Sequence, residues 1–289
     1  MYVFCRKYIL FILILLLLVS TISIFYLDWQ SSKKELTFAM LDIGQGDALF
    51  IESPTGTQIL IDGGPTGKIL GRLSRVMPPF DRHIDGIIIT NPDQDHIGGF
   101  LDVLKVYKVG KVFEPGTFTD SKTYQNLRTE IENKNIPDFL ARNGMRLNIG
   151  GGAIIDILFP DRDVLSWATN DGSMVARLVY GGTSIMLTGD ATIKTERLIM
   201  EKIKDTELES TILKVGHHGS RTSTSPEFVK TVAPTYALIS DGKDNKYGHP
   251  HQETLNALSS LGAEIFRTDL LGNIIMKSNG QNITFSFRK

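Results

Sequence analysis

Several short apolar runs in this chain end directly in carboxylates, amides or histidines. The run 59–61 is followed by Asp62, "IIIT" leads into "NPDQDH" at 91–96, "IMLT" is followed by Gly and Asp190, and "ILKV" leads into "GHHGS". Runs of this length and composition are typical of buried strands. Strand ends that meet at one edge of a sheet bring such side chains into one cleft, where open α/β sheets commonly bind ligands.

The rest of the chain has the periodicity of an α/β protein. Apolar strand runs are predicted at 36–42, 48–53, 58–61, 86–90, 154–159, 175–180, 184–188, 212–215, 236–240 and 273–276. Helix-like spacing of apolar residues is found between them at 98–107, 121–134, 192–204, 225–231 and 251–260. No composition break divides residues 36–289, so we expect one domain there.

Two helix starts have a recognisable signature. Ser225 before Pro226 predicts an N-cap followed by proline at the first helical position. Pro250 is expected to open a helix in the same way.

The N-terminal segment predicts a membrane anchor. Residues 8–27 are apolar and uncharged over a length that crosses the core of a bilayer. A cleaved signal peptide is the alternative, but no small-x-small cleavage site follows the run, which favours an uncleaved helix. The predicted organisation is a short tail at 1–7, the transmembrane anchor at 8–27, a linker at 28–35 and the domain at 36–289.

Flanking charges indicate how the anchor is oriented. Arg6 and Lys7 precede the apolar run directly, whereas Lys33 and Lys34 lie further away and are offset by nearby acidic residues. The positive-inside rule then predicts a cytoplasmic N-terminus. The chain is expected to be a single-pass protein of the cell membrane, with its domain on the extracytoplasmic side.

Charge and cysteine content exclude some classes of function. The 31 basic and 32 acidic residues give a net charge of −1, so no global basic field attracts nucleic acid and any such binding must be local. The only cysteine, Cys5, lies outside the predicted domain. This excludes an intramolecular disulfide and a thiolate metal cluster.

Histidines concentrate in the loops that follow the predicted strands. Of the six in the chain, one is His83, to which we assign no role. The other five lie in the strand-end loops or in "NKYGHPHQE", and they are His96, His217, His218, His249 and His251.

Six motifs in fixed order carry a resemblance to a known family. They are "LDIGQGDA", "LIDGG", "TNPDQDHIGG", "LTGD", "LKVGHHGS" and "YGHP", and together they span essentially all of residues 36–289. This series resembles the metallo-β-lactamase-fold domain of ComEC-type DNA-uptake (competence) proteins. The resemblance implies an α/β fold of four layers, αββα, with a metal-dependent hydrolase site at one edge of its sheets. It also implies a nuclease at the outer membrane face, for which a separate membrane channel protein would be a partner, because the channel part of those proteins is missing from this sequence.

The resemblance implies a set of metal ligands from which this chain departs. The family signature His-x-His-x-Asp-His falls on Asn91, Asp93, Asp95 and His96, so two of its three histidines are absent. A bridging aspartate matches Asp190, and the last histidine ligand matches His217.

A further histidine ligand of the family has no counterpart here. No histidine occurs from Ile97 to Gly216, and the equivalent region is "TNDGSMVARL". Within it, Asn170, Asp171 or Ser173 is expected to substitute weakly.

These ligands predict one firm metal site and one weak one. The firm site would have two oxygen and two nitrogen donors, from Asp95, His96, Asp190 and His217. The weak site would have oxygen donors alone, from Asn91, Asp93, Asp190 and Asn170. Oxygen-rich shells favour Mn²⁺ or Mg²⁺ over Zn²⁺. Because a bound ion activates its water as a nucleophile, Asp95, His96 and Asp190 are the predicted catalytic residues.

Neighbouring residues are expected to support the metal or contact the substrate. Asp62 is predicted to order the ligand loop, as the matching aspartate does in the family, and Asp42 and Asp47 are predicted to act similarly. Donors for a substrate phosphate are expected from His218, Ser220, Arg221 and His249, with Lys214 as a possible neighbour.

Structural explanations stay open for several of these residues. Asp95 suits the N-cap of the next helix, and Asn91 and Asp93 suit a turn. His217 and His218 are alternatively packed, hydrogen-bonded histidines.

The predicted function is that of a membrane-anchored, metal-dependent hydrolase, a phosphodiesterase or nuclease that acts on single- or double-stranded DNA. One alternative is a non-catalytic module that binds DNA or protein and has an eroded metal site. A second is a lactonase-like hydrolase of small molecules, against which the missing histidines argue, since that chemistry relies on a histidine-rich zinc site in this fold.

Overall fold

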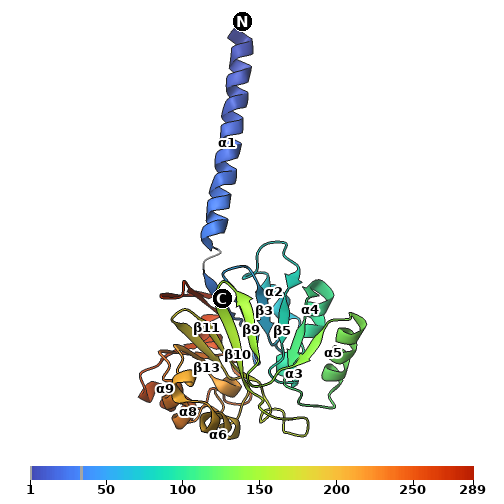
Figure 1. Cartoon of the computed structure of the whole chain (residues 1–289), viewed down its shortest axis with the longest axis vertical. Helices are drawn as coiled ribbons and strands as arrows, with labels where there is room; N and C mark the ends of the chain where they lie inside the picture. Colours follow the sequence, from blue (N-terminus) through green and yellow to red (C-terminus); the bar gives the residue numbers. More distant parts are fainter. Residues whose placement is uncertain (1, 33–34) are drawn as a thin grey trace.

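A computed structural model describes the backbone of residues 2–32 and 35–289 and the side chains of residues 8–26 and 35–289. The chain begins with helix α1 (Tyr2–Ser32) and continues into a domain of two large sheets and flanking helices (Figure 1). The charges on which the predicted orientation depends, at positions 6, 7, 33 and 34, lie outside the described side chains. The orientation therefore stays a prediction.

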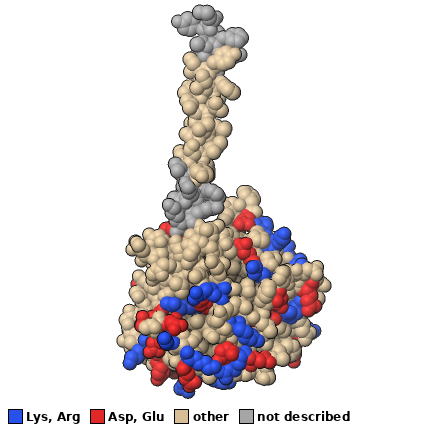
Figure 2. Space-filling model, in the orientation of Figure 1, with Lys and Arg blue, Asp and Glu red and all other residues tan. Residues whose placement is uncertain are grey.

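Helix α1 has the length and composition of a membrane span. Residues Tyr8–Tyr26 have a mean hydropathy of 2.9, and none of these side chains is buried in the rest of the molecule. Figure 2 shows this stretch without a charged side chain, whereas acidic and basic residues are interspersed over the lower part and right side of the domain. A signal sequence would have the same properties, so the predicted division at 1–7, 8–27 and 28–35 stays a prediction.

One sheet has eight strands in the order β17-β16-β1-β2-β3-β5-β7-β8. Strands β3, β5, β7 and β8 run parallel to one another, and the remaining neighbours pair antiparallel. The strands are β1 (Leu36–Met40), β2 (Leu49–Glu52), β3 (Gln58–Ile61), β5 (Gly86–Ile88), β7 (Val112–Glu114), β8 (Asp138–Leu140), β16 (Asn273–Ser278) and β17 (Ile283–Arg288). A separate small sheet pairs β4 (His83–Ile84) with β6 (Lys108–Val109).

The other large sheet has seven strands in the order β15-β14-β13-β12-β11-β10-β9. Strands β12 to β15 are parallel, and β9 to β12 pair antiparallel. The strands are β9 (Arg146–Gly150), β10 (Ala153–Phe159), β11 (Val175–Tyr180), β12 (Thr183–Leu187), β13 (Ile212–Lys214), β14 (Tyr236–Ile239) and β15 (Glu264–Arg267).

Helices cover the outer face of each sheet, which gives the predicted four layers (Figure 1). The eight-stranded sheet packs against α2 (Lys68–Leu73), α4 (Phe100–Val106) and α5 (Lys122–Asn133) through one apolar cluster. The seven-stranded sheet packs against α6 (Ile193–Lys202), α8 (Pro226–Val232) and α9 (Gln252–Ser260) through another. Shorter helices are α3 (Gln94–Ile97), α7 (Asp205–Leu208), α10 (Thr268–Leu271) and the 3-10 turn η1 (Gly216–Gly219). The αββα prediction is confirmed.

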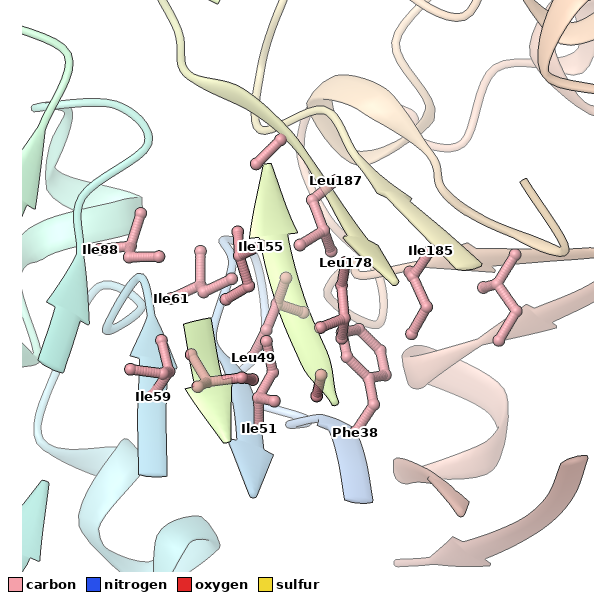
Figure 3. Close-up of a cluster of buried hydrophobic side chains, with 14 of the residues drawn as sticks. Phe38, Leu49, Ile51, Ile59, Ile61, Ile88, Ile155, Leu178, Ile185 and Leu187 are labelled. Carbon is pink, nitrogen blue, oxygen red and sulfur yellow. The ribbon is translucent and has the colours of Figure 1, made fainter. Parts of the chain in front are cut away.

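The inner faces of the two sheets share one apolar core (Figure 3). Phe38 and Ile51 of the eight-stranded sheet are fully buried there with Ile155 and Leu178 of the seven-stranded sheet. Burial in β10 alternates residue by residue, as the period of a strand requires. Packing between the sheets therefore holds the strand ends of both sheets at a common edge.

The predicted strands and helices all have counterparts in the structure, with ends shifted by a few residues. The N-cap prediction at Ser225 is confirmed, because its Oγ accepts a hydrogen bond of 3.2 Å from the amide of Phe228 and Pro226 opens α8. The prediction for Pro250 is wrong. Helix α9 begins at Gln252, since the amide of His251 donates to the carbonyl of Gly219 and the residue stays extended.

Truncation of Phe38 tests the shared core. We expect Phe38→Ala to lower the free energy of unfolding by about 3–5 kcal/mol, because the change leaves a cavity between the sheets. Phe80→Ala is the matched control, because Phe80 is 94% exposed, and should change stability by less than about 0.5 kcal/mol. Chemical denaturation of the full chain in detergent micelles, followed by near-ultraviolet circular dichroism, measures both. Equal losses would contradict the assigned core.

Candidate metal centre

Parallel strands of both sheets deliver polar side chains to one edge of the sandwich. Asp62 follows β3 and residues 90–96 follow β5 in the eight-stranded sheet. Asp190 follows β12, and η1 follows β13, in the seven-stranded sheet. The loop between β1 and β2 adds Asp47. The convergence predicted from the strand ends is therefore present in the structure.

Four of these side chains form a compact group. One donor atom from each lies within 4.8 Å of the others, and the group is Asp95, His96, Asp190 and His218. The Nε2 atom of His96 is 3.1 Å from Oδ2 of Asp190, and Nε2 of His218 is 3.4 Å from Oδ2 of Asp95. This four-residue group offers two oxygen and two nitrogen donors from two different sheets.

Unpaired buried atoms show that the four-residue group suits a cation. His96 Nε2, His218 Nε2 and Asp190 Oδ1 are buried, and none has a hydrogen-bond partner among the described residues. Such atoms are costly to bury unless something satisfies them. Carboxylate oxygens and imidazole nitrogens are both ligands of divalent metal ions. The residues present therefore fit a metal ion at this point.

The charges within this group depend strongly on one another. Burial alone would lower the pKa of His96, but Asp190 and Asp62 raise it well above its ordinary value. Burial alone would raise the pKa of Asp190, but His96 and His218 hold it well below its ordinary value. Burial also opposes the charged form of His218, yet Asp190 and Asp47 raise its pKa to about 10. The carboxylates thus form a negative centre that favours positive charge.

Asp62 orients His96 from behind. Its Oδ2 lies 2.8 Å from Nδ1 of His96, and its Oδ1 accepts a hydrogen bond of 2.8 Å from the amide of Thr90. The Thr90 hydroxyl donates to the same carboxylate. A carboxylate on the far ring nitrogen fixes the imidazole and leaves Nε2 directed at the four-residue group. This geometry suits the supporting role predicted for Asp62, a role that stays a prediction.

Asp47 and Ser240 lie behind His218 in a similar way. The Nδ1 atom of His218 is 2.9 Å from the carbonyl oxygen of Ser240 and 3.5 Å from Oδ1 of Asp47. Burial would raise the pKa of Asp47, but Lys214 and then His218 lower it to about 2. Lys214 is itself buried, pairs with Asp47 and donates to the carbonyl of Gly189. The expectation that Lys214 neighbours a substrate phosphate is therefore wrong.

A backbone reversal sets the directions of the two adjacent histidines. His217 and His218 both have left-handed φ angles, of 48° and 56°. A non-glycine residue rarely holds such a conformation unless its surroundings enforce it. The reversal buries His218 in the four-residue group and leaves the His217 side chain 24% exposed, with its Nε2 3.8 Å from Oδ2 of Asp190.

The histidine placement differs from the expectation drawn from the sequence. His217 was the expected ligand and His218 the expected substrate contact, whereas the compact group contains His218 and not His217. The Nδ1 atom of His217 lies 3.1 Å from the Thr222 hydroxyl. The roles of both histidines stay predictions.

The residues expected to form the weak site are also together, but they bind one another. The amide nitrogen of Asn91 donates to Oδ1 of Asn170 at 2.7 Å and to Oγ of Ser173 at 3.1 Å. The amide oxygen of Asn91 accepts from the backbone of Asp93. The Asp93 carboxylate accepts from Thr169, and burial raises its pKa. Hydrogen bonds therefore engage atoms that a second ion would need.

Three further expectations for aspartates are contradicted. Asp171, a candidate for the missing ligand, bonds to side chains at the start of α6 and does not join the four-residue group. Asp42, expected to order the ligand loop, instead pairs with Arg72 on α2. Asp95 is not an N-cap, because it lies inside α3 and the cap position is occupied by Asp93.

The other expected substrate contacts differ in exposure. The Ser220 side chain is buried, with its hydroxyl 2.9 Å from that of Thr222. The Arg221 side chain is 62% exposed, and its guanidinium lies 3.9 Å from the carboxylate of Glu253. The His249 ring is 5.7 Å from that of His217, and burial together with His218 lowers the pKa of His249 to about 4.

The remaining histidines lie apart from the four-residue group. The His251 ring is 4.9 Å from that of His249, and its Nδ1 accepts from the amide of Arg221. His83 lies on β4 beside Asp85, consistent with the absence of an assigned role.

The chain matches a model of a protein family and also individual known proteins. A family model described as Metallo-beta-lactamase superfamily matches residues 41–240, which include the four-residue group. The chain is 33% identical over 271 residues to ComE operon protein 3 of Bacillus subtilis (strain 168), covering 86% of this chain and 34% of that protein. It is 29% identical over 245 residues to Competence protein ComA of Neisseria gonorrhoeae, covering 83% of this chain and 32% of that protein. The chain thus spans about a third of the length of these relatives.

A solved structure agrees at the level of the fold. The metallo-beta-lactamase fold protein YhfI from Bacillus subtilis matches with a TM-score of 0.51 and 13% identity, covering 80% of this chain and 96% of that chain. The resemblance to ComEC-type competence proteins that the ordered motifs predict is confirmed by the curated relatives. Motifs, fold and family match agree: this chain belongs to the metallo-beta-lactamase superfamily.

Proposed function

We propose that this chain is a membrane-anchored, metal-dependent phosphodiesterase that cleaves DNA. The observation that carries the proposal is the four-residue group, in which two carboxylates and two imidazoles converge with unpaired atoms at the edge of a hydrolase fold. Relatives named as competence and recombination proteins support DNA as the substrate. A separate channel protein is the proposed partner for a role in DNA uptake.

The chain's own residues would prepare the site for this chemistry. A divalent ion bound by the four-residue group would supply an activated water and positive charge for a phosphate oxygen. Asp62 and the Ser240 carbonyl orient the two imidazoles so that both Nε2 atoms face the centre. Arg221 is exposed and would bind a neighbouring phosphate in place of its contact with Glu253.

We further propose Mn²⁺ or Mg²⁺ as the native ion, with one firm site. The weak site offers only oxygen donors, and these suit the harder ions better than Zn²⁺. Because Asn91 and Asn170 are hydrogen-bonded to each other, a second ion would have to displace that contact.

A non-catalytic binding module is the second candidate, and one observation favours it. The hydrogen bonds of Asn91 to Asn170 and Ser173 fill the place of a second metal site with a closed polar network. Hydrolysis of phosphodiesters often uses two ions, which clamp the attacking and leaving oxygens. A chain that holds one ion at most would bind DNA or a partner protein without turnover.

Metal titration tests the ligand set. We expect the full chain in detergent micelles to bind Mn²⁺ in isothermal titration calorimetry, and His218→Ala or Asp190→Ala to weaken binding by ~100-fold or more, since loss even of an outer-shell partner costs about 10–100-fold. His83→Ala is the histidine control and should bind as the native chain does. A large loss in His217→Ala without one in His218→Ala would support His217 as the ligand instead.

Cleavage of labelled DNA tests the proposed activity. We expect the full chain in micelles to cut single- or double-stranded DNA with Mn²⁺ and not with chelator. Asp190→Ala should reduce cleavage by ~100-fold or more, because it removes a ligand from the centre. Asp205→Ala is the matched control, since Asp205 is exposed on α7. A folded chain that binds DNA but cuts it with no ion would favour the binding module.

Reporter fusions test the proposed topology. A phosphatase that matures only outside the cytoplasm, fused after Lys289, should be active, because the proposed orientation puts the domain on the extracytoplasmic side. A fluorescent protein that matures only in the cytoplasm should stay dark at the same position. Membrane fractionation of the same fusions should recover the intact chain in the membrane. The reverse reporter pattern, or a shortened soluble product, would contradict an anchor of this orientation.

A further inference from the structure

A pocket of about 530 Å³ opens beside the four-residue group. Its volume is within the range of small-molecule sites. Asp95 belongs both to this side pocket and to the four-residue group, so an occupant would lie next to the proposed reaction centre. The pocket is lined by Gln45, Pro65, Gln94, Asp95, Asn245, Lys246 and Tyr247.

The loop that carries Tyr247 is built by hydrogen bonds from one side chain. The amide nitrogen of Asn245 donates to the carbonyls of Gly242 and His249, at 3.0 and 2.7 Å. Its amide oxygen accepts from the backbone of Tyr247 and of His249. Gly242 packs so closely on the backbone of Gln45 that a Cβ would lie 2.7 Å from its nitrogen. The loop is therefore held in a defined position over the pocket.

Tyr247 presents an aromatic ring at the wall of this pocket. The residue is 53% exposed. Its ring stacks on that of His249, with centroids 5.6 Å apart and an interplanar angle of 23°. The His249 ring is in turn 6.4 Å from that of His218. Two ring contacts thus connect Tyr247 to the four-residue group.

The rest of the lining supplies one ammonium group and several carboxamides. The Lys246 ammonium lies over the Tyr247 ring, 5.1 Å from its centroid, and so places a positive charge next to this ring. Gln45 and Gln94 contribute carboxamides, which both donate and accept hydrogen bonds. An aromatic wall with amides and one ammonium matches a flat heterocycle that carries a phosphate.

The geometry points to a nucleobase subsite: a base next to the scissile phosphate of a single-stranded nucleic acid stacks on Tyr247, with its backbone beside Lys246. This inference rests on the proposed function and names its substrate class. Aromatic side chains bind unpaired bases of any sequence because every base has a π-face. A base inside a duplex is already stacked and paired, so it would have to be unpaired before it could enter.

Binding of oligonucleotides with and without bases tests the subsite. The probes are fluorescent phosphorothioate strands of equal length, one of thymidines and one abasic, mixed with the full chain in micelles and Mn²⁺. We expect the thymidine strand to bind about tenfold more tightly by fluorescence anisotropy, as stacking on one aromatic ring allows. Tyr247→Ala should abolish this preference, and Tyr247→Phe should keep it. Phe80→Ala, which removes another exposed aromatic ring, should leave it unchanged.

The outcomes separate this subsite from the proposed activity. A preference for bases that survives in Tyr247→Ala, or its absence in the native chain, would overturn the subsite. Equal Mn²⁺-dependent cleavage of thymidine and abasic phosphodiester strands would retain the hydrolase and also reject the subsite. A preference that depends on Tyr247 in a chain that cuts no DNA would support the subsite while the hydrolase fails.

Discussion

The buried carboxylate of Asp190 is the constraint on which the functional edge of this molecule depends. It lies between the imidazoles of His96 and His218, where burial without positive charge would be costly. Its neighbours are fixed by partners further out, including Asp62 and the carbonyl of Ser240. The surrounding loops are thus arranged around a site for positive charge, and this arrangement places a candidate metal site at the edge of a strand-rich scaffold.

Much of this fold could be predicted from the sequence, because central strands are continuous apolar runs between turn residues. The strands that were missed lie largely at the sheet edges, as β8, β9 and β17 do, where mixed polarity hides the pattern. The candidate site was predictable where a ligand directly follows a strand. The placement of His217 and His218 was not predictable, because both residues have left-handed backbone angles that the sequence does not indicate. The contacts of the Thr90 hydroxyl with Asp62 and of the Ser240 carbonyl with His218 could not be predicted, because neither residue stands out in the sequence as a functional type.

The two halves of the expected metal centre differ in how their donors are used. Around Asp190, donor atoms are buried and have no hydrogen-bond partner among the described residues. Around Asn91, side-chain amides bond to one another. An amide carries its own donor and acceptor, so a cluster of amides satisfies itself. The side chains of Asn91 and Asn170 therefore use in hydrogen bonds the amide atoms that a cation would need.

The four-residue group draws two members from each sheet, Asp95 and His96 from one and Asp190 and His218 from the other. A ligand bound by residues of both sheets would link the two halves of the sandwich. Linkage then requires that whatever binds there also strengthens the packing between the sheets, by about 2.7 kcal/mol at a concentration one hundred times its dissociation constant. Conversely, a shift of one sheet relative to the other would move the two pairs of donor atoms apart and so change the affinity for the ligand.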